Sequence, residues 1–565
     1  MKQKSYELDA TIPDVLFITP PIWDVHLPYA AVPQLMGACK NAGLESMQID
    51  FAILAFRIMF ERCCKKNIDK FLTREYYENR VAVWKNSPVN TFDEYLEKVA
   101  FLSNPDFGFE IAKATFNNGG LLEKGIISAL IDSVLASYSA KSSTGVFNVA
   151  ESFEQQSSKI IDECIAQCKL LALLQQDIKL VGISVTGIIQ LRFTKEVIDA
   201  LRVINPFMKI VLGGNAITLA VRSNFSNAVP LLELSDFLLI GEGETSIVHL
   251  AQYCLGNQSN LSEIPGLIYK TEEGIMSNPT NLEDIETVSK PCFDGVNFNQ
   301  YVLPEPMFPY HTSRGCFYGQ CAFCDHDPEY RHNYRQKSVR KVVSEILELA
   351  KQTGLRNVQF TDEAIEPGFF REMVLEMERT PEFHDIFWLC YLRVSRVYDE
   401  ETVRLAAKNG CRMVLFGIET FQQRLLNFIK KGQDAQTAKE NLRLFHRHGI
   451  KTFSWFMFGL PSETIVEALS DVKTIQEISE NLDGFYNGSF RLSPNTDMSR
   501  DTAKYNIIDY DAYDGLSFAT HNDGNLVDVK KVREAYRSKI TSFKRSNYFS
   551  SDRYVLYYDD AHKYI

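Results

Sequence analysis

Three cysteines, Cys316, Cys321 and Cys324, lie within nine residues of one another in the second half of the chain. The segment around them reads Ser-Arg-Gly-Cys-Phe-Tyr-Gly-Gln-Cys-Ala-Phe-Cys and precedes an expected helix. Soft thiolates at short spacing are ligands that iron–sulfur clusters and zinc both accept. With no fourth cysteine nearby, three thiolates would leave one iron of a [4Fe–4S] cluster open, and an open metal position is typical of a catalytic site.

A structural zinc ion is the alternative for these cysteines. His326 or His332 would then supply the fourth ligand. On that interpretation the chain is a zinc-stabilised binding protein, and metal analysis would find zinc without iron.

The other nine cysteines need no chemical role. Cys164 and Cys168 are four residues apart on an expected helix, where they share one face, and no third thiol follows them. We expect them to be buried helix residues, and we expect the adjacent pair Cys63 and Cys64 to be inert.

The composition is that of a globular protein of several domains. The 565 residues include 45% hydrophobic and 23% charged residues, and the formal net charge is −12. An acidic chain is a poor general binder of nucleic acid, because phosphate contacts need an excess of Lys and Arg. The first residues lack the features of a signal peptide, and no apolar run is long enough to span a membrane. These observations predict a cytoplasmic location with reduced thiols, no membrane partner and no nucleic-acid partner.

The first half of the chain alternates strands with helices, which predicts a parallel sheet of the Rossmann type. Gly43 is expected to end the helix at 29–42, and a mainly helical insertion is expected at 52–176. Ligands bind such sheets at the carboxyl ends of the strands. The expected strands are 15–19, 44–50, 179–185, 209–212 and 237–240.

A proline-rich connection, 264–309, separates this half from a second series of strands and helices. Its five or six strand–helix units predict a full or partial β/α barrel with its ligands at the carboxyl ends of the strands. The residues after 500 are expected to form a small helical cap. The strands expected after the cysteine segment are 358–361, 387–393, 412–416, 452–458 and 484–492.

The cysteine segment resembles the cluster-binding loop of radical S-adenosylmethionine (SAM) enzymes. That family usually has C-x3-C-x2-C with an aromatic residue before the third cysteine, the place that Phe323 fills. This chain has C-x4-C-x2-C, with Gly319 in the enlarged gap. The resemblance implies a [4Fe–4S] cluster held by Cys316, Cys321 and Cys324, with SAM bound to the open iron.

Later motifs, in the family's order, strengthen the resemblance. They are Gln-Phe-Thr-Asp-Glu at 359–363, Trp-Leu-Cys-Tyr-Leu-Arg at 388–393, Gly-Ile-Glu-Thr at 417–420 and Phe-Gly-Leu-Pro-Ser-Glu-Thr at 458–464. A lone Asp-Glu pair is more often a helix cap, because acidic side chains favour helix N-termini. The resemblance implies that SAM is contacted by Phe323, Asp362, Glu363, Arg393, Glu419 and Gly459.

A Rossmann domain ahead of the barrel is, in this superfamily, usually a cobalamin-binding domain. Glycines allow the backbone to approach a bulky corrin closely, and hydroxyls can bind its nucleotide tail. The D-x-H-x-x-G motif that supplies histidine to cobalt elsewhere is absent. The alternative is a domain that binds nothing. The residues implied for cobalamin are Ser184, Thr186, Gly213, Gly214, Gly241, Glu242 and Gly243.

The predicted fold is therefore α/β, with three parts. A Rossmann-type, cobalamin-binding-like domain at 1–290 carries the insertion 52–176. A partial (β/α)6 radical SAM barrel follows at 300–500, and a small helical cap occupies 501–565. The resemblance is to cobalamin-dependent radical SAM methyltransferases.

The resemblance implies methylation of an unactivated carbon or a phosphinate-type centre in a small natural product or a peptide. The implied electron donor is a flavodoxin or ferredoxin. Related architectures instead perform cyclisation, ring contraction or oxidation without methyl transfer, and the sequence leaves that alternative open.

Overall fold

The structure is a computed structural model that describes residues 12–21, 24–82, 88–143, 151–168, 170–187, 189–257, 260–510, 518–522 and 524–546. The chain divides into two compact units. Unit 1 comprises Met1–Ile68, Gly108–Lys113 and Ala129–Pro309, and unit 2 comprises Asp69–Phe107, Ala114–Ser128 and Tyr310–Ile565. Among the described residues, no helix is both long and apolar enough to cross a bilayer.

Unit 1 contains a seven-stranded sheet in the order β2-β1-β3-β4-β5-β6-β7. The pairings among the first five strands are parallel, and β6 and β7 extend the sheet as an antiparallel hairpin beside β5. The five strands expected from the sequence are confirmed within two residues at each end. The strands are β1 (Val15–Thr19), β2 (Ser46–Asp50), β3 (Leu180–Ser184), β4 (Lys209–Gly213), β5 (Phe237–Leu239), β6 (Leu267–Thr271) and β7 (Gly274–Ser277).

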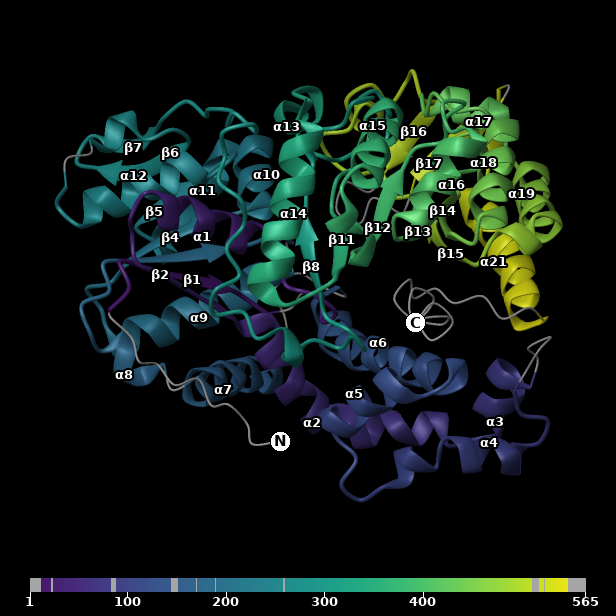
Figure 1. Cartoon of the computed structure of the whole chain (residues 1–565), viewed down its shortest axis with the longest axis horizontal. Coiled ribbons are helices and arrows are strands. Elements are labelled where there is room, and N and C mark those ends of the chain that lie inside the picture. The colour runs from purple at the N-terminus through teal and green to yellow at the C-terminus, as the bar shows by residue number, and fades with distance from the viewer. Residues whose placement is uncertain are drawn as a thin grey trace. The chain divides into compact units, whose positions relative to one another are not determined.

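Helices cover both faces of this sheet, with α1 and α12 on one side and α7 and α9 on the other (Figure 1). Alternate strand residues such as Val15 and Phe17 pack with Val32 and Met36 of α1 and with Ile247 of α12. Every residue of β1, β3 and β5 is buried, and burial on both faces explains why these strands are largely apolar rather than alternating. The helices of unit 1 that connect the strands are α1 (Ala31–Asn41), α7 (Glu151–Gln167), α8 (Leu171–Leu174), α9 (Gln190–Ile204), α10 (Asn215–Ser223), α11 (Ala228–Leu234) and α12 (Glu244–Cys254).

The expected insertion is helical where the structure describes it, but its residues are shared between the two units. In unit 1, the rings of Phe56, Phe60 and Phe109 lie 5.9 Å apart, centroid to centroid. In unit 2, Tyr77 packs 5.5 Å from Tyr95. The helices are α2 (Phe51–Phe71), α3 (Arg74–Tyr76), α4 (Phe92–Lys98), α5 (Phe109–Asn118) and α6 (Leu121–Ser143).

The second sheet has six strands in the order β15-β14-β13-β12-β11-β8, so its strands follow one another in chain order, and β11 to β15 belong to unit 2. The strands from β11 to β15 pair in parallel, which agrees with the expected partial barrel. Two short strands, β9 (Ser313–Arg314) and β10 (Arg335–Gln336), form a separate pair. The six strands are β8 (Met307–Tyr310), β11 (Asn357–Phe360), β12 (Phe387–Leu392), β13 (Cys411–Glu419), β14 (Lys451–Phe458) and β15 (Gly484–Ser489).

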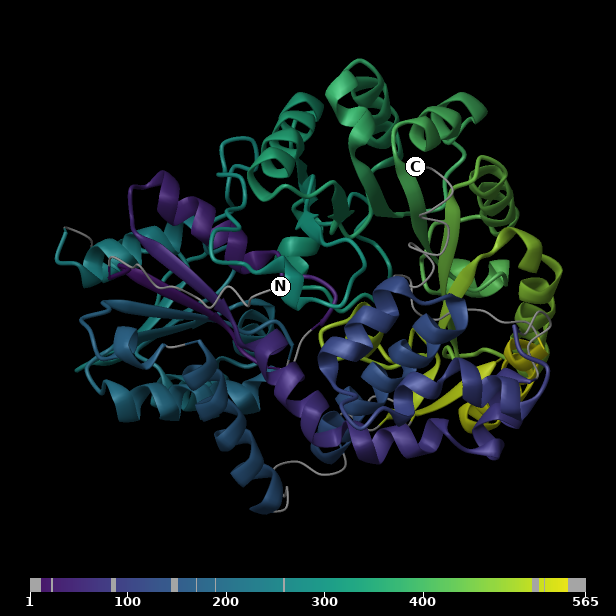
Figure 2. The same cartoon turned by 60° about the horizontal axis from the view of Figure 1, so that its bottom comes forward.

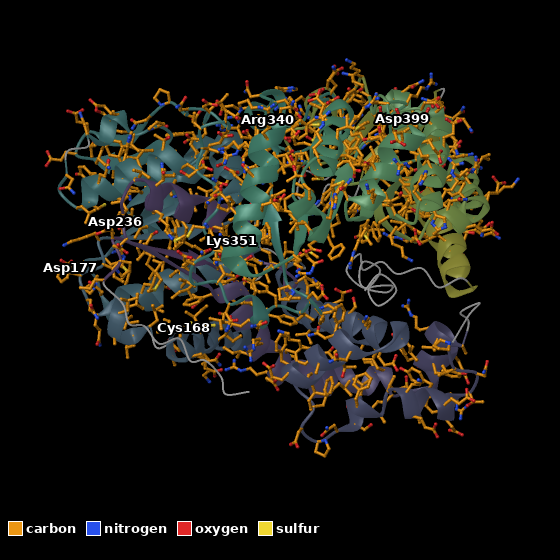
Figure 3. All side chains as sticks on the ribbon, viewed as in Figure 1. Cys168, Asp177, Asp236, Arg340, Lys351 and Asp399 are labelled. Carbon is orange, nitrogen blue, oxygen red and sulfur yellow. The ribbon has the colours of Figure 1, made fainter. Side chains whose placement is uncertain are left out.

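The helices between these strands lie along one side of the sheet (Figure 2). All of them except α17 begin with a side-chain cap. Asp399, which Figure 3 labels, accepts a hydrogen bond from the Thr402 amide at 2.7 Å at the start of α16. Such caps satisfy amides that have no partner within the helix. The helices are α13 (Pro328–His332), α14 (Val339–Thr353), α15 (Pro367–Glu378), α16 (Glu400–Lys408), α17 (Gln423–Phe428), α18 (Ala435–Arg447) and α19 (Ile465–Glu477).

The expected small helical cap at 501–565 is wrong in part. After α20 (Asp497–Arg500) the chain forms a three-stranded antiparallel sheet of β16 (Ile507–Tyr510), β17 (Phe518–Asn522) and β18 (Asn525–Val527), and only then α21 (Val529–Ser546). Pairing with neighbouring strands outweighs the weak local preferences of these short polar segments. Residues 547–565 of the expected cap lie outside the described residues.

Candidate active site

The three cysteines lie on the loop between β9 and α13, in unit 2. Cys321 is buried, whereas Cys316 and Cys324 are partly exposed. The Gly319 amide donates a hydrogen bond to the Cys316 Sγ at 3.4 Å. Burial raises the pKa of the Cys324 thiol, so a bound cation would be needed to keep it as a thiolate near neutral pH.

Three thiolates are a donor set that both a [4Fe–4S] cluster and a zinc ion accept. Among the described residues, no group of three His, Cys, Asp or Glu side chains is placed to hold a metal ion. His326 and His332, the fourth ligands expected for zinc, contact Glu363 and Arg331 respectively.

Arg331, which the sequence analysis missed, holds the cysteine loop in shape. Its side chain is 2% exposed, and its Nη1 donates to the carbonyl oxygens of Cys324 at 3.0 Å and Cys321 at 3.4 Å. Its own carbonyl accepts from the Cys316 amide at 3.2 Å. The buried Arg331 guanidinium therefore contacts the backbone carbonyls of two of the cysteines. The Arg331 backbone carbonyl contacts the amide of the third.

Asp362 lies beneath the start of the same loop, at the carboxyl end of β11. Its Oδ1 accepts from the Ser313 amide at 2.7 Å, the Ser313 hydroxyl at 2.5 Å and the Thr312 hydroxyl at 2.7 Å. Burial raises the pKa of this carboxyl, and these bonds oppose that rise. The structure therefore places Asp362 as a brace for the segment that leads into the cysteines.

Glu363, its neighbour, is partly exposed and pairs with His326, whose Nε2 lies 2.8 Å from the Glu363 Oε2. Burial lowers the pKa of His326, but the Glu363 contact outweighs it and the net shift is upward. Of the acidic pair expected near SAM, Glu363 is thus the residue whose carboxylate is accessible beside the loop.

Glu419 and Lys431 form a buried ion pair at the end of β13. The Lys431 Nζ lies 2.7 Å from the Glu419 Oε1, and both side chains are largely shielded from water. Glu419 has φ of +70°, a conformation that is unfavourable for a residue with a side chain and marks a constrained position. Lys431 also lies 5.5 Å from the centre of the Phe323 ring, in the cysteine loop.

Arg393 reaches the same place from the end of β12. It is 8% exposed, and its Nη1 lies 3.6 Å from the Cys321 Sγ. Its Nη2 donates to the Lys431 carbonyl. The structure therefore brings together Phe323, Arg393 and Glu419, three of the residues expected to contact SAM, beside the cysteines.

Gly459 follows β14 with φ of +75°, and a Cβ there would lie 2.6 Å from the Arg533 Nε of α21. The Gly459 amide donates to the buried carboxylate of Glu463. The contact with α21 and the role of Glu463 were missed, because an acidic residue inside a turn motif gives no sign of burial.

In unit 1, Ser184 and Thr186 lie at the carboxyl end of β3. Thr186 donates its amide to Gln190 Oε1 at 2.8 Å, and the Gln190 Nε2 donates to the Pro20 carbonyl at 2.7 Å, which links the ends of β3 and β1. The Thr186 hydroxyl is buried and has no hydrogen-bond partner among the described residues. A buried hydroxyl without a partner is unfavourable, and a ligand would satisfy it.

The three glycine loops lie at the same edge of the sheet. Gly214 has φ of +98°, and a Cβ there would lie 2.4 Å from the Val185 carbonyl oxygen, so only glycine fits. Gly213 ends β4, and the Gly241 amide donates to Thr218 Oγ1 at 3.1 Å.

After β5, Gly243 is the N-cap of α12, and a Cβ there would lie 3.3 Å from Leu35 of α1. The Glu242 carboxylate accepts from the Glu283 amide at 2.7 Å, so its side chain engages the segment after β7.

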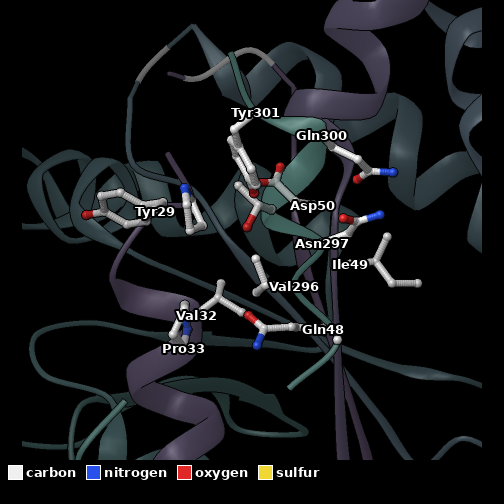
Figure 4. A pocket seen from close by; sticks show the side chains of 13 residues that line it. Tyr29, Val32, Pro33, Gln48, Ile49, Asp50, Val296, Asn297, Gln300 and Tyr301 are labelled. Atoms are coloured by element: carbon white, nitrogen blue, oxygen red, sulfur yellow. The ribbon is translucent and has the colours of Figure 1, made fainter. Parts of the chain in front are cut away.

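A small pocket lies at the carboxyl ends of β1 and β2 (Figure 4). Asp50 and Tyr301 line it, and the Tyr301 hydroxyl donates to the Asp50 Oδ2 at 2.5 Å. Its free space is about 20 Å³, enough for a water molecule and too little for a substrate.

Comparisons with known proteins agree with this geometry. Residues 310–475 match the family model of the Radical SAM superfamily. The chain is 25% identical over 320 residues to an uncharacterized methyltransferase of Pyrococcus horikoshii, which covers 54% of this chain and 68% of that protein. It is 24% identical over 352 residues to the anaerobic magnesium-protoporphyrin IX monomethyl ester cyclase of Rubrivivax gelatinosus, covering 59% of this chain and 61% of the cyclase.

A solved structure also matches over most of the chain. The radical SAM methyltransferase TsrM from Kitasatospora setae, with cobalamin and a [4Fe–4S] cluster bound, aligns with a TM-score of 0.55 at 18% identity. The alignment covers 86% of this chain and 76% of TsrM. Fold and site thus agree with the match of residues 310–475 to the Radical SAM superfamily model, and the fold of the chain is similar to that of TsrM.

Proposed function

We propose that this chain is a cobalamin-dependent radical SAM methyltransferase that acts on an unactivated carbon or a phosphinate-type centre of a small natural product or a peptide. The observation that carries the proposal is the convergence of Arg393, Glu419 and Lys431 on a loop with three cysteines, in a chain that also has a Rossmann-type sheet. The methyltransferase names of the Pyrococcus and Kitasatospora proteins support it.

Cys316, Cys321 and Cys324 would hold a [4Fe–4S] cluster, which supplies the electron that cleaves SAM, while cobalamin supplies a carrier for the methyl group. Arg393 and Lys431 would face the SAM carboxylate, since both cations lie beside the cysteine loop.

Glu419, Glu363 and the Gly459 turn would hold the rest of SAM. Glu419 is fixed by Lys431 and by its constrained backbone, so its carboxylate is oriented before a ligand binds. Glu363 offers a carboxylate for the SAM amino group. Asp362 would not contact SAM, because its carboxyl binds Ser313 and supports the segment that leads into the cysteine loop.

In unit 1, the Thr186 hydroxyl and the glycine loops would receive cobalamin. The unpartnered hydroxyl is the observation that fits a polar ligand there. Ser184 and the backbone of Gly213, Gly214, Gly241 and Gly243 would line the same edge, with Glu242 held in place by the segment after β7.

The test is anaerobic purification with iron, sulfide and cobalamin, followed by incubation with SAM and a reductant such as reduced flavodoxin. We expect iron–sulfur absorbance, retained corrin and formation of 5′-deoxyadenosine. Cys316→Ala should abolish all cluster absorbance, whereas Cys254→Ala, a partly exposed cysteine at the end of α12, should not. A wild-type protein without iron–sulfur absorbance would contradict the radical assignment, and one without corrin would contradict the cobalamin part.

Cyclisation without methyl transfer is the second candidate, favoured by the similarity to the Rubrivivax cyclase. SAM with a deuterated methyl group separates the two functions once a substrate is found. Label in the product supports methyl transfer, and an unlabelled product with consumed SAM supports the cyclase-like reaction.

A further inference from the structure

The enlarged gap of the cysteine motif has a structural role in unit 2. Four residues separate Cys316 from Cys321, and the third of them, Gly319, has φ of +63° and turns the loop back on itself. This turn brings the Gly319 amide to the Cys316 sulfur.

Tyr318 connects the cysteine loop to the segment after α17. Its hydroxyl donates to the Lys430 carbonyl at 2.8 Å. Gly432 makes room for the ring, because a Cβ at that position would lie 2.2 Å from the Tyr318 Oη. Tyr318 and Gly432 are therefore matched to one another, although 113 positions of the chain separate them in sequence order.

The ring of Tyr318 also packs against Arg393. The Arg393 guanidinium carbon lies 4.0 Å from the ring centre, a short cation–π contact. With its Nη2 on the Lys431 carbonyl, the guanidinium is fixed on two sides, and its Nη1 points at the Cys321 sulfur from 3.6 Å.

We propose that Arg393 raises the reduction potential of the iron–sulfur cluster by donating a charge-assisted hydrogen bond to the Cys321 sulfur, and that Tyr318 is the positioning residue that holds it there. The proposal rests on the proposed function, because it requires the cluster. Reduction takes one electron from an external donor and makes or breaks no bond to the chain. The added negative charge is stabilised by a nearby cation and N–H donor, and the stabilisation is large where water is excluded.

The experiment is a redox titration of the reconstituted full chain, followed by the electron paramagnetic resonance signal of the reduced cluster. It is run without SAM, so that contacts from Arg393 to SAM cannot contribute. For Arg393→Gln we expect the ratio of reduced to oxidised cluster at a fixed potential to fall at least tenfold, which is about 59 mV for a one-electron couple. Tyr318→Leu should lower this ratio by a smaller factor than Arg393→Gln does. Tyr318→Phe keeps the aromatic ring and should lower the ratio least of the three variants.

Arg396→Gln is the matched control, because Arg396 is three residues further along the same chain segment and its side chain is 81% exposed. It should leave the potential unchanged. If the wild-type protein assembles no cluster, the proposed function fails. If Arg393→Gln carries a full cluster with the wild-type potential, this inference alone is overturned. Should Arg393→Gln fail to assemble a cluster, Tyr318→Leu decides, since an unchanged potential there overturns the role of the pair.

Discussion

Glu463 is a buried acid beside the turn that follows β14 in unit 2. Its side chain is 1% exposed, and its Oε2 accepts from the amides of Gly459 and Leu460. Burial, together with the nearby carboxylate of Asp471, raises the pKa of Glu463 to about 8. Near neutral pH the carboxyl is therefore mostly protonated, and a neutral brace supports the turn that we expect to face SAM.

This shift predicts how stability depends on pH. The unfolded chain releases the Glu463 proton near pH 4.5, whereas the folded chain keeps it until about pH 8. Between these values the folded state binds the extra proton, so the free energy of unfolding falls as pH rises. Glu463→Gln removes this contribution, and urea unfolding between pH 5 and 9 should show a flatter dependence than in the wild type.

Glu467→Gln serves as the comparison for that experiment. Glu467 is partly buried too, but its contacts with Arg424 and Thr464 outweigh burial and lower its pKa, so it stays ionised from pH 5 upward. Its substitution should change the slope much less than Glu463→Gln does, because the Glu467 charge is the smallest of the causes that raise the pKa of Glu463. If the free energy of unfolding depends on pH identically in the wild type and in Glu463→Gln, the pKa of Glu463 is not raised in the folded state.

At the scale of elements, the loop between β4 and α10 depends on one glycine. Gly214 adopts φ of +98° and ψ of 173°, a conformation nearly restricted to glycine, and Val185 lies directly against it. This close approach sets the distance between the β3 and β4 loops, where we expect cobalamin to bind.

Gly214→Ala should therefore lower the free energy of unfolding of unit 1 by about 3 kcal/mol, from both backbone strain and the clash with the Val185 carbonyl. Gly256→Ala separates the two causes, because Gly256 also has positive φ but would place its Cβ in open space. It should cost about 1 kcal/mol. Urea unfolding of the full chain measures both, and equal losses would contradict the clash.

The sequence predicts elements well where a local pattern sets them and poorly where distant residues do. The run 15–19 identifies a strand because it is apolar and buried on both faces. The cysteine loop and its neighbours Arg393 and Glu419 could be predicted from motifs. Arg331 and Tyr318 could not, since their roles come from contacts that the fold creates.

At the scale of the whole molecule, the two expected cofactor sites are built from separate parts of the chain. The residues expected for cobalamin, from Ser184 to Gly243, all belong to unit 1, and those expected for the cluster and SAM, from Cys316 to Gly459, all belong to unit 2. Each set is held by hydrogen bonds within its own unit, such as Gln190 to Pro20 and Arg331 to Cys324. Loss of one cofactor should therefore leave the other site formed.

This independence predicts that two variants have opposite effects on cofactor content. The measurement is the corrin and iron content after anaerobic purification. The combined variant Cys316→Ala, Cys321→Ala and Cys324→Ala should lose iron and retain corrin. Thr186→Val should keep iron and bind corrin more weakly by about three- to tenfold, the effect of one hydrogen bond to the ligand. Because the Thr186 hydroxyl has no partner among the described residues, this substitution should not lower stability. Loss of corrin from the triple variant would show instead that the cluster loop is needed for cobalamin to bind.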